Sequence, residues 1–226
     1  MLAMGLSQYT ARLAQVDPEA LWDTGMVVVL SAFGLSRALL VVENLRMFLA
    51  HPVLVLELPS LTKEGLFLTV AVAAVYVWRK GLALLRALDA AAPCGALLWG
   101  FLELGGVADG TREGMPTAVP WAVASVFGRV HPVEAYSAIA GLSLCAGLLW
   151  VLRLERRTGE TAGWGLALAG LLVFVLDFFR LPLELYGTSR LEEIEWRALE
   201  SMIAGGALLA WAMVRGAGRG DLGDAV

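Results

Sequence analysis

The sequence predicts an all-α polytopic membrane protein with about six transmembrane helices. Hydrophobic residues make up 58% of the chain and charged residues only 17%, and the mean hydropathy of +0.71 is far above that of a soluble domain. Apolar runs recur at lengths approaching the roughly 20 residues needed to cross hydrocarbon. In lipid the backbone must satisfy its own hydrogen bonds, so these runs are expected to be helices. They occupy residues 24–42, 64–79, 82–102, 133–152, 162–181 and 197–214.

Basic residues predict how these spans are oriented. They cluster between the second and third spans, after the fourth and after the sixth, which is the same side of a six-span arrangement. The positive-inside rule makes that side cytoplasmic. We therefore expect an N-terminal surface segment (1–21), a transmembrane domain (22–214) and a disordered cytoplasmic tail (215–226). The clusters are Arg79, Lys80 and Arg86; Arg153, Arg156 and Arg157; and Arg215 and Arg219.

Composition and motifs exclude several classes of protein. The net charge is −4 and there is no basic tail, so nucleic acid is not an expected partner. Cys94 and Cys145 lie in apolar stretches and are predicted to be small buried side chains, not a disulfide or a metal site. Phosphate-binding glycine loops, Cys-x-x-Cys and a serine nucleophile elbow do not occur in the sequence. We expect no cofactor.

Several charged residues lie inside the spans. Arg37 could line an internal cavity or form a structural ion pair, and the two interpretations are equally supported. Asp89 could be a functional acid, but a helix pair with Arg86 is favoured because three residues separate them. Asp177 and Arg180, also three apart, could hold a lipid phosphate with the guanidinium as a fork. A structural clamp to a neighbouring helix is favoured for this pair.

The stretch "HPVEAY" places polar groups where the fourth span begins. His131 and Glu134 stand three residues apart, and a His-x-x-Glu pair can supply two metal ligands. The other histidine, His51, lies in a separate outer loop, so a third ligand is not evident and no metal site is predicted. Tyr136 follows one turn into the span. The stretch therefore predicts a helix with a polar mouth on the outer side of the membrane.

"HPVEAY" also resembles the His-Pro-x-Gln-x-Tyr-Glu motif of the prolipoprotein diacylglyceryl transferases. These bacterial inner-membrane enzymes move diacylglyceryl from phosphatidylglycerol to the lipobox cysteine of a prolipoprotein. Four more segments resemble family motifs in the same order, over about residues 30–182: "VVENLRMFLAHP", "LDAAAPCGALLWG", "GMPTAVPWAV" and "VLDFFRLP". The resemblance implies the family's fold, an inner-membrane location, a phosphatidylglycerol-like ligand, and a lipoprotein or membrane-protein partner.

The sequence departs from the family at positions that the resemblance makes functional. Glu103 stands in place of an arginine and Gly106 in place of an asparagine. Lys63 replaces a histidine, Ala169 a tyrosine and Val173 an arginine, and the family's first span has no counterpart. The leaving group of the family reaction is an anionic glycerol phosphate, which arginines hold and stabilise. These substitutions therefore predict weak or no transfer.

The favoured prediction is a phospholipid-binding relative of the transferases. The alternatives are an active diacylglyceryl transferase with a relocated site, and another lipid-modifying enzyme on the same fold. In a relocated site, His131 or Glu134 would accept the proton of the lipobox thiol, and Arg180 and Arg129 would act on the phosphate. The residues predicted to bind lipid are Arg129, Tyr136, Asp177 and Arg180.

Overall fold

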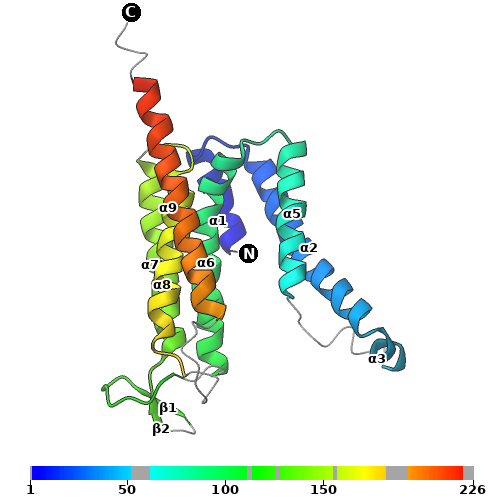
Figure 1. Cartoon of the computed structure of the whole chain (residues 1–226), viewed down its shortest axis with the longest axis vertical. Coiled ribbons are helices and arrows are strands. Elements are labelled where there is room, and N and C mark those ends of the chain that lie inside the picture. The colour runs from blue at the N-terminus through cyan, green and yellow to red at the C-terminus, as the bar shows by residue number, and fades with distance from the viewer. Residues whose placement is uncertain are drawn as a thin grey trace, which may run out of the picture.

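Helices make up most of the chain in the computed structural model, which describes residues 2–51, 62–110, 114–125, 128–154, 157–181 and 193–220. A two-stranded antiparallel hairpin lies at one end of the helical bundle (Figure 1). Its strands are β1 (Val123–Ser125) and β2 (Gly128–Val130). The helices are α1 (Leu2–Leu13), α2 (Pro18–Glu43), α3 (Leu45–Ala50), α5 (Lys63–Arg79), α6 (Leu84–Asp109), α7 (Val133–Arg153), α8 (Glu160–Asp177) and α9 (Glu193–Gly220).

Five of these helices are long and apolar enough to cross a membrane: α2, α6, α7, α8 and the part of α9 over Glu195–Arg215. They coincide with five of the six predicted spans. The remaining predicted span forms α5, whose 17 residues are at the lower limit of about 17–25 for a transmembrane helix. The chain is therefore a multi-pass membrane protein with an all-α membrane domain, as the sequence predicts.

Successive helices from α5 to α9 alternate in direction (Figure 1). The end of α5, the start of α6, the α7–α8 connection and the end of α9 consequently lie at one end of the bundle, opposite the β-hairpin. The described residues of the predicted basic clusters belong to these segments, and Arg156 lies outside the described residues. Their common placement is what the positive-inside rule requires of a single cytoplasmic face.

Reporter fusions placed after Arg157 and after Arg219 should both report the cytoplasm. The reason is that both positions follow helices that run toward the end of the bundle carrying the basic clusters. Paired phosphatase and fluorescent-protein fusions would measure this, with a fusion after Asp109 as the control for the opposite face. A periplasmic signal after either arginine would contradict the six-span arrangement.

The helices of the bundle approach each other through small residues. Gly205 of α9 lies against α8, where an added Cβ would come within 2.7 Å of the carbonyl oxygen of Gly163. Gly141 of α7 lies against Gly100 of α6, with 2.7 Å between its added Cβ and the Gly100 nitrogen. Small residues let helix backbones pack closely in lipid, where van der Waals packing is one of the forces that drive helices together.

Asp89 performs a structural role that the sequence did not predict. Its buried carboxylate accepts hydrogen bonds from the backbone nitrogens of Gly159 (2.6 Å) and Ala162 (2.8 Å) at the start of α8. Among the described residues no ion pair joins it to Arg86, so the favoured helix pair is wrong. Asp89 instead supplies from α6 the acceptor that the unpaired N–H groups of a helix N-terminus need.

The N-terminal helix α1 packs into the bundle along one side. Thr10 and Ala11 are completely buried, and Ala11 joins a core cluster with Ala87 and Ala90 of α6. The Thr10 hydroxyl lies 3.6 Å from the Cys94 thiol. The segment predicted to lie on the surface thus contributes to the core.

At the other end of the chain α9 continues to Gly220, inside the predicted tail. Residues 221–226 lie outside the described part.

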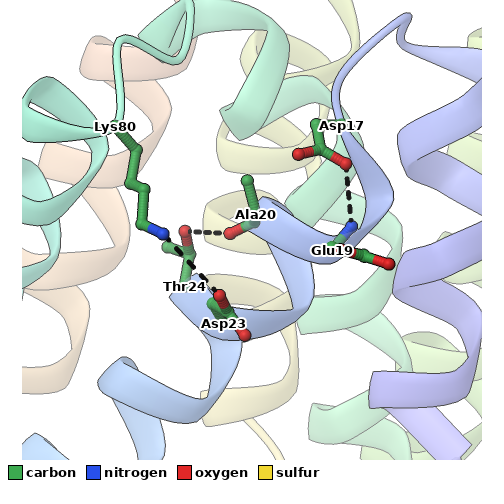
Figure 2. Close-up of polar contacts among 6 residues, drawn as sticks. All are labelled: Asp17, Glu19, Ala20, Asp23, Thr24 and Lys80. Atoms are coloured by element: carbon green, nitrogen blue, oxygen red, sulfur yellow. Dashed lines mark hydrogen bonds and ion pairs between the residues drawn. The ribbon is translucent and has the colours of Figure 1, made fainter.

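Helices α2 and α5 form a hairpin beside the bundle (Figure 1). The two helices come close at Gly65, where an added Cβ would stand 2.6 Å from the Ser36 Cα. Figure 2 shows the contacts at its bundle end, where Lys80 reaches Asp23 at 3.9 Å and Asp17 caps the start of α2 through the Glu19 nitrogen at 3.1 Å.

Arg37 lies farther along α2, near the short helix α3. Its guanidinium carbon stands 6.0 Å from the centroid of the Phe48 ring. Phe48 belongs to α3 and is 4% exposed. A cation over an aromatic face is favourable, so this contact helps to hold α3 against α2.

Candidate functional site

Three segments form a small backbone ladder at the end of the bundle that carries the β-hairpin. The Met115 nitrogen donates to the carbonyl oxygen of Phe179 (2.9 Å), and the His131 nitrogen donates to the carbonyl oxygen of Met115 (3.0 Å). Isolated antiparallel bridges join Gly114 to Arg180 and Pro116 to Val130. The segment around Met115 therefore lies between the end of α8 and the residues that enter α7, and it ties Arg180 to His131.

Gly114 makes this ladder possible. A Cβ at this position would run into the carbonyl oxygen of His131 and would stand 3.0 Å from its carbonyl carbon. Real Cβ atoms do not come this close to backbone, so a side chain at position 114 would push the two segments apart. Gly114 therefore allows its own segment to lie close to the segment that contains His131.

Aromatic side chains cluster around His131. The Trp121 Nε1–H donates to the Tyr136 hydroxyl at 2.6 Å, and the same hydroxyl lies 3.2 Å from His131 Nδ1. The Phe179 ring meets both partners edge-on, with its centroid 5.2 Å from that of His131 and 6.0 Å from that of Tyr136. The structure therefore brings the predicted residues His131 and Tyr136 together, beside Trp121 and Phe179.

Arg180 and Asp177 form an ion pair with each other. Arg180 Nη1 lies 3.6 Å from Asp177 Oδ1, and the side chains are 22% and 9% exposed. Arg180 Nε is buried and, within the part of the chain that the structure describes, has no hydrogen-bond partner. A buried N–H that makes no hydrogen bond is costly. The guanidinium therefore has an unused donor directed away from bulk water.

Arg129 is exposed and holds the loop that precedes it. Its Nη2 donates to the carbonyl oxygens of Val119 (3.3 Å) and Pro120 (3.1 Å). These bonds connect β2 to the loop that carries Trp121. Part of the guanidinium of this predicted lipid-binding residue is thus engaged with backbone.

The helices α6 and α7 each carry a buried carboxyl group near the end of the bundle that holds the β-hairpin. Glu134, 7% exposed, places Oε1 3.0 Å from where a Cβ of Gly106 would be. Glu103, also 7% exposed, accepts a hydrogen bond from Trp99 Nε1 at 3.3 Å. The absence of a side chain at Gly106 leaves the space that the Glu134 carboxylate enters. The predicted site residue Glu134 therefore lies against α6.

The sequence did not single out Trp121, Phe179 or Gly114 as members of a site. Trp121 and Gly114 lie within "GMPTAVPWAV", and Phe179 within "VLDFFRLP". Both segments carried the resemblance to the transferases, so the signal was present at the level of motifs. Their hydrogen-bond partners could not be read from spacing, because Trp121 and Tyr136 belong to different segments joined through β1 and β2.

Comparison with known proteins gives the chain a family. The sequence model of prolipoprotein diacylglyceryl transferases matches residues 1–211. A phosphatidylglycerol–prolipoprotein diacylglyceryl transferase of Idiomarina loihiensis is 32% identical over 122 residues, which cover 52% of this chain and 46% of that protein. One of Geobacter sulfurreducens is 32% identical over 148 residues, which cover 62% and 56%. The chain thus spans about half the length of these relatives. With the family match over nearly its whole length, the chain belongs to the prolipoprotein diacylglyceryl transferase family.

Proposed function

We propose that the chain binds an anionic phospholipid of the phosphatidylglycerol type in a bacterial inner membrane, with weak or no transfer of diacylglyceryl to a lipoprotein cysteine. The binding site is the cluster at the hairpin end, with Arg180, Asp177, Tyr136 and Arg129 as lipid-binding residues. The observation that carries the proposal is the buried Nε–H of Arg180, which has no hydrogen-bond partner among the described residues.

The geometry around Arg180 suits a phosphate oxygen. Asp177 lies 3.6 Å from one terminal nitrogen, which orients the guanidinium and leaves Nε–H for a ligand. Charge-assisted bonds from a guanidinium to phosphate are short and strong, and the planar fork favours two oxygens of one anion. The side chain is only 22% exposed, so water competes less for this donor.

The same end of the molecule supplies little of what the transfer step needs. Charge grows on the glycerol phosphate as it leaves, and preorganised cationic donors stabilise that charge. Glu103 on α6 and Glu134 on α7 are buried carboxyl groups. On α8, Ala169 packs against the apolar core and Val173 carries no donor.

The link between His131 and Arg180 through the Met115 segment favours a second candidate function, a transferase with a relocated site. Arg180 would hold the phosphate while His131 or Glu134 accepted the thiol proton. The partner of such a transferase would be a prolipoprotein, as in the names of the relatives. A lipid-binding relative without transfer activity would instead have a membrane-protein partner. Another lipid-modifying reaction on the same fold is the remaining alternative.

Replacing Arg180 should weaken binding of phosphatidylglycerol. Hydrogen bonds to charged groups contribute about 1.5–3 kcal/mol, so Arg180→Ala should lower affinity roughly tenfold to hundredfold. Arg180→Lys should lose less, because it keeps the charge but not the fork. Native mass spectrometry of protein exchanged between nanodiscs of phosphatidylcholine and phosphatidylglycerol would measure retained lipid.

Two further variants make this experiment specific. Arg129→Ala should have a smaller effect than Arg180→Ala, because its Nη2 already binds two carbonyl oxygens. Arg153→Ala is the matched control: it removes the same charge at the opposite end of the bundle, where Nε of this arginine binds the Tyr9 hydroxyl at 3.0 Å. Equal retention of phosphatidylglycerol by wild type and Arg180→Ala would overturn the proposed site.

A further inference from the structure

We infer that Trp121 and Tyr136 are positioning residues that hold neutral His131 with its proton on Nε2. His131 then acts toward a ligand as a hydrogen-bond donor and not as a proton acceptor. The hydrogen-bond relay is read from the contacts of three side chains, and only the identity of the ligand depends on the proposed function. Nothing in the transfer chemistry is needed for the assignment.

The direction of the relay follows from what each group can donate. An indole Nε1–H is a donor only, so the 2.6 Å contact makes the Tyr136 oxygen an acceptor from Trp121. The tyrosine has one hydroxyl hydrogen left to donate. Among the described residues its hydroxyl contacts only Trp121 and His131. The hydroxyl therefore donates to His131 Nδ1 at 3.2 Å, and a neutral imidazole that accepts at Nδ1 carries its hydrogen on Nε2.

Packing keeps the three groups in this arrangement. The Phe179 ring meets the rings of His131 and Tyr136 edge-on, and the backbone of His131 is fixed to Met115. Trp121 is 60% exposed, whereas His131 and Tyr136 are partly buried. The outermost member of the relay thus orients the inner two through a single strong hydrogen bond.

The assignment decides between the alternatives for proton transfer. With Nδ1 occupied by the tyrosine, neutral His131 offers an Nε2–H to an oxygen atom of a ligand. The Met115 segment also joins the backbone of Arg180 to that of His131, and Arg180 Nε–H has no hydrogen-bond partner among the described residues. An N–H donor of either kind suits a phosphate or carbonyl oxygen. Of the two predicted proton acceptors, Glu134 is then the one that remains.

Nitrogen NMR of the imidazole tests the tautomer directly. The chain has two histidines, so His51→Gln leaves His131 as the only imidazole. In full-length protein in phosphatidylcholine nanodiscs at alkaline pH, we expect a protonated Nε2 and an unprotonated, hydrogen-bonded Nδ1. Tyr136→Phe should shift the Nδ1 signal toward that of a free imidazole nitrogen. Trp121→Phe should give a mixture of tautomers, since the hydroxyl is then free to accept from Nδ1.

Two variants far from His131 in the sequence serve as matched controls. Tyr76→Phe and Trp164→Phe make the same changes on α5 and α8 and should leave the His131 signals unchanged. A protonated Nδ1 in the parent protein, or an Nδ1 signal unaffected by Tyr136→Phe, would overturn the relay. An unaltered tautomer in Trp121→Phe would remove Trp121 from it. Adding phosphatidylglycerol tests the ligand separately: an unmoved Nε2–H signal with the relay intact would count against the proposed lipid site alone.

Discussion

Expressed in bacteria depleted of their own prolipoprotein diacylglyceryl transferase, the chain should fail to restore prolipoprotein processing. In a purified assay with a lipobox peptide and phosphatidylglycerol, its rate should lie at least about a hundredfold below that of a full-length relative, because removing one oxyanion-type donor already costs about that much. The resemblance to the family motifs implies that several family positions, among them 103, 169 and 173, lack their donors in this chain. The measurement is accumulation of unprocessed lipoprotein on gels, with a relative as the positive control.

The physical basis of this prediction is the charge of the departing group. A glycerol phosphate becomes more negative as its bond to diacylglyceryl breaks, and a dry site of low dielectric magnifies every nearby charge. Glu103 is buried and bonded to Trp99, where the resemblance places an arginine. A carboxylate there opposes the developing charge. Val173 offers no group that could replace a guanidinium fork.

Restored growth with mature lipoprotein would refute the prediction of weak or no transfer and favour a transferase with a relocated site. In that case Arg180→Ala and Arg129→Ala should abolish or reduce processing through the phosphate. His131→Ala would then report on the donor that the Trp121 relay holds in place. Retained activity in all three variants would show that the reaction uses a different set of residues.

Gly205→Ala should lower the stability of the membrane domain, whereas Gly206→Ala, one residue later on α9, should not. At Gly205 an added Cβ would stand 2.7 Å from the Gly163 carbonyl oxygen and 2.9 Å from the Ala167 Cα. These are backbone atoms that can move only if α8 and α9 separate. At Gly206 nothing lies within 4 Å of the added Cβ.

The two substitutions share the same gain in helix propensity of roughly 1 kcal/mol, so their difference isolates packing. Overpacking of a close contact typically costs about 1–3 kcal/mol, and Gly205→Ala should therefore melt earlier than Gly206→Ala. Thermal unfolding in one detergent, followed by near-ultraviolet circular dichroism of the tryptophans, provides the measurement. Equal midpoints would show that α8 and α9 do not pack through Gly205 as described.

The spans were predictable because a transmembrane helix is encoded locally. Each apolar run is continuous in sequence, and lipid leaves the backbone few alternatives to helix. Residues 133–152 were predicted as a span, and α7 covers Val133–Arg153. Contacts between segments were not predictable in this way. Asp89 meets Gly159 across 70 positions of chain, so its nearest basic neighbour in sequence was a misleading guide.

The candidate site shows the same division. Asp177 and Arg180 pair with each other and not with a neighbouring helix, and the pair forms although α8 ends at Asp177 and Arg180 lies beyond it. The pairing of His131 with Tyr136 could be expected only in part, since both lie at the mouth of one helix. Nothing local indicated that Trp121 donates to Tyr136 or that Glu134 lies against Gly106. Those contacts depend on how the loop before β1 folds back and on how closely α6 and α7 approach.

The backbone ladder through Met115 has a consequence for affinity. Phe179, Met115 and His131 are joined by successive main-chain hydrogen bonds, so the backbones at Arg180 and His131 are linked to each other before any ligand arrives. Ordering a flexible side chain on binding costs about 0.5–1.5 kcal/mol, and a site already held in its bound geometry avoids much of that loss. Because a preorganised site loses less conformational entropy on binding, a few contacts are enough to keep a lipid headgroup bound for longer.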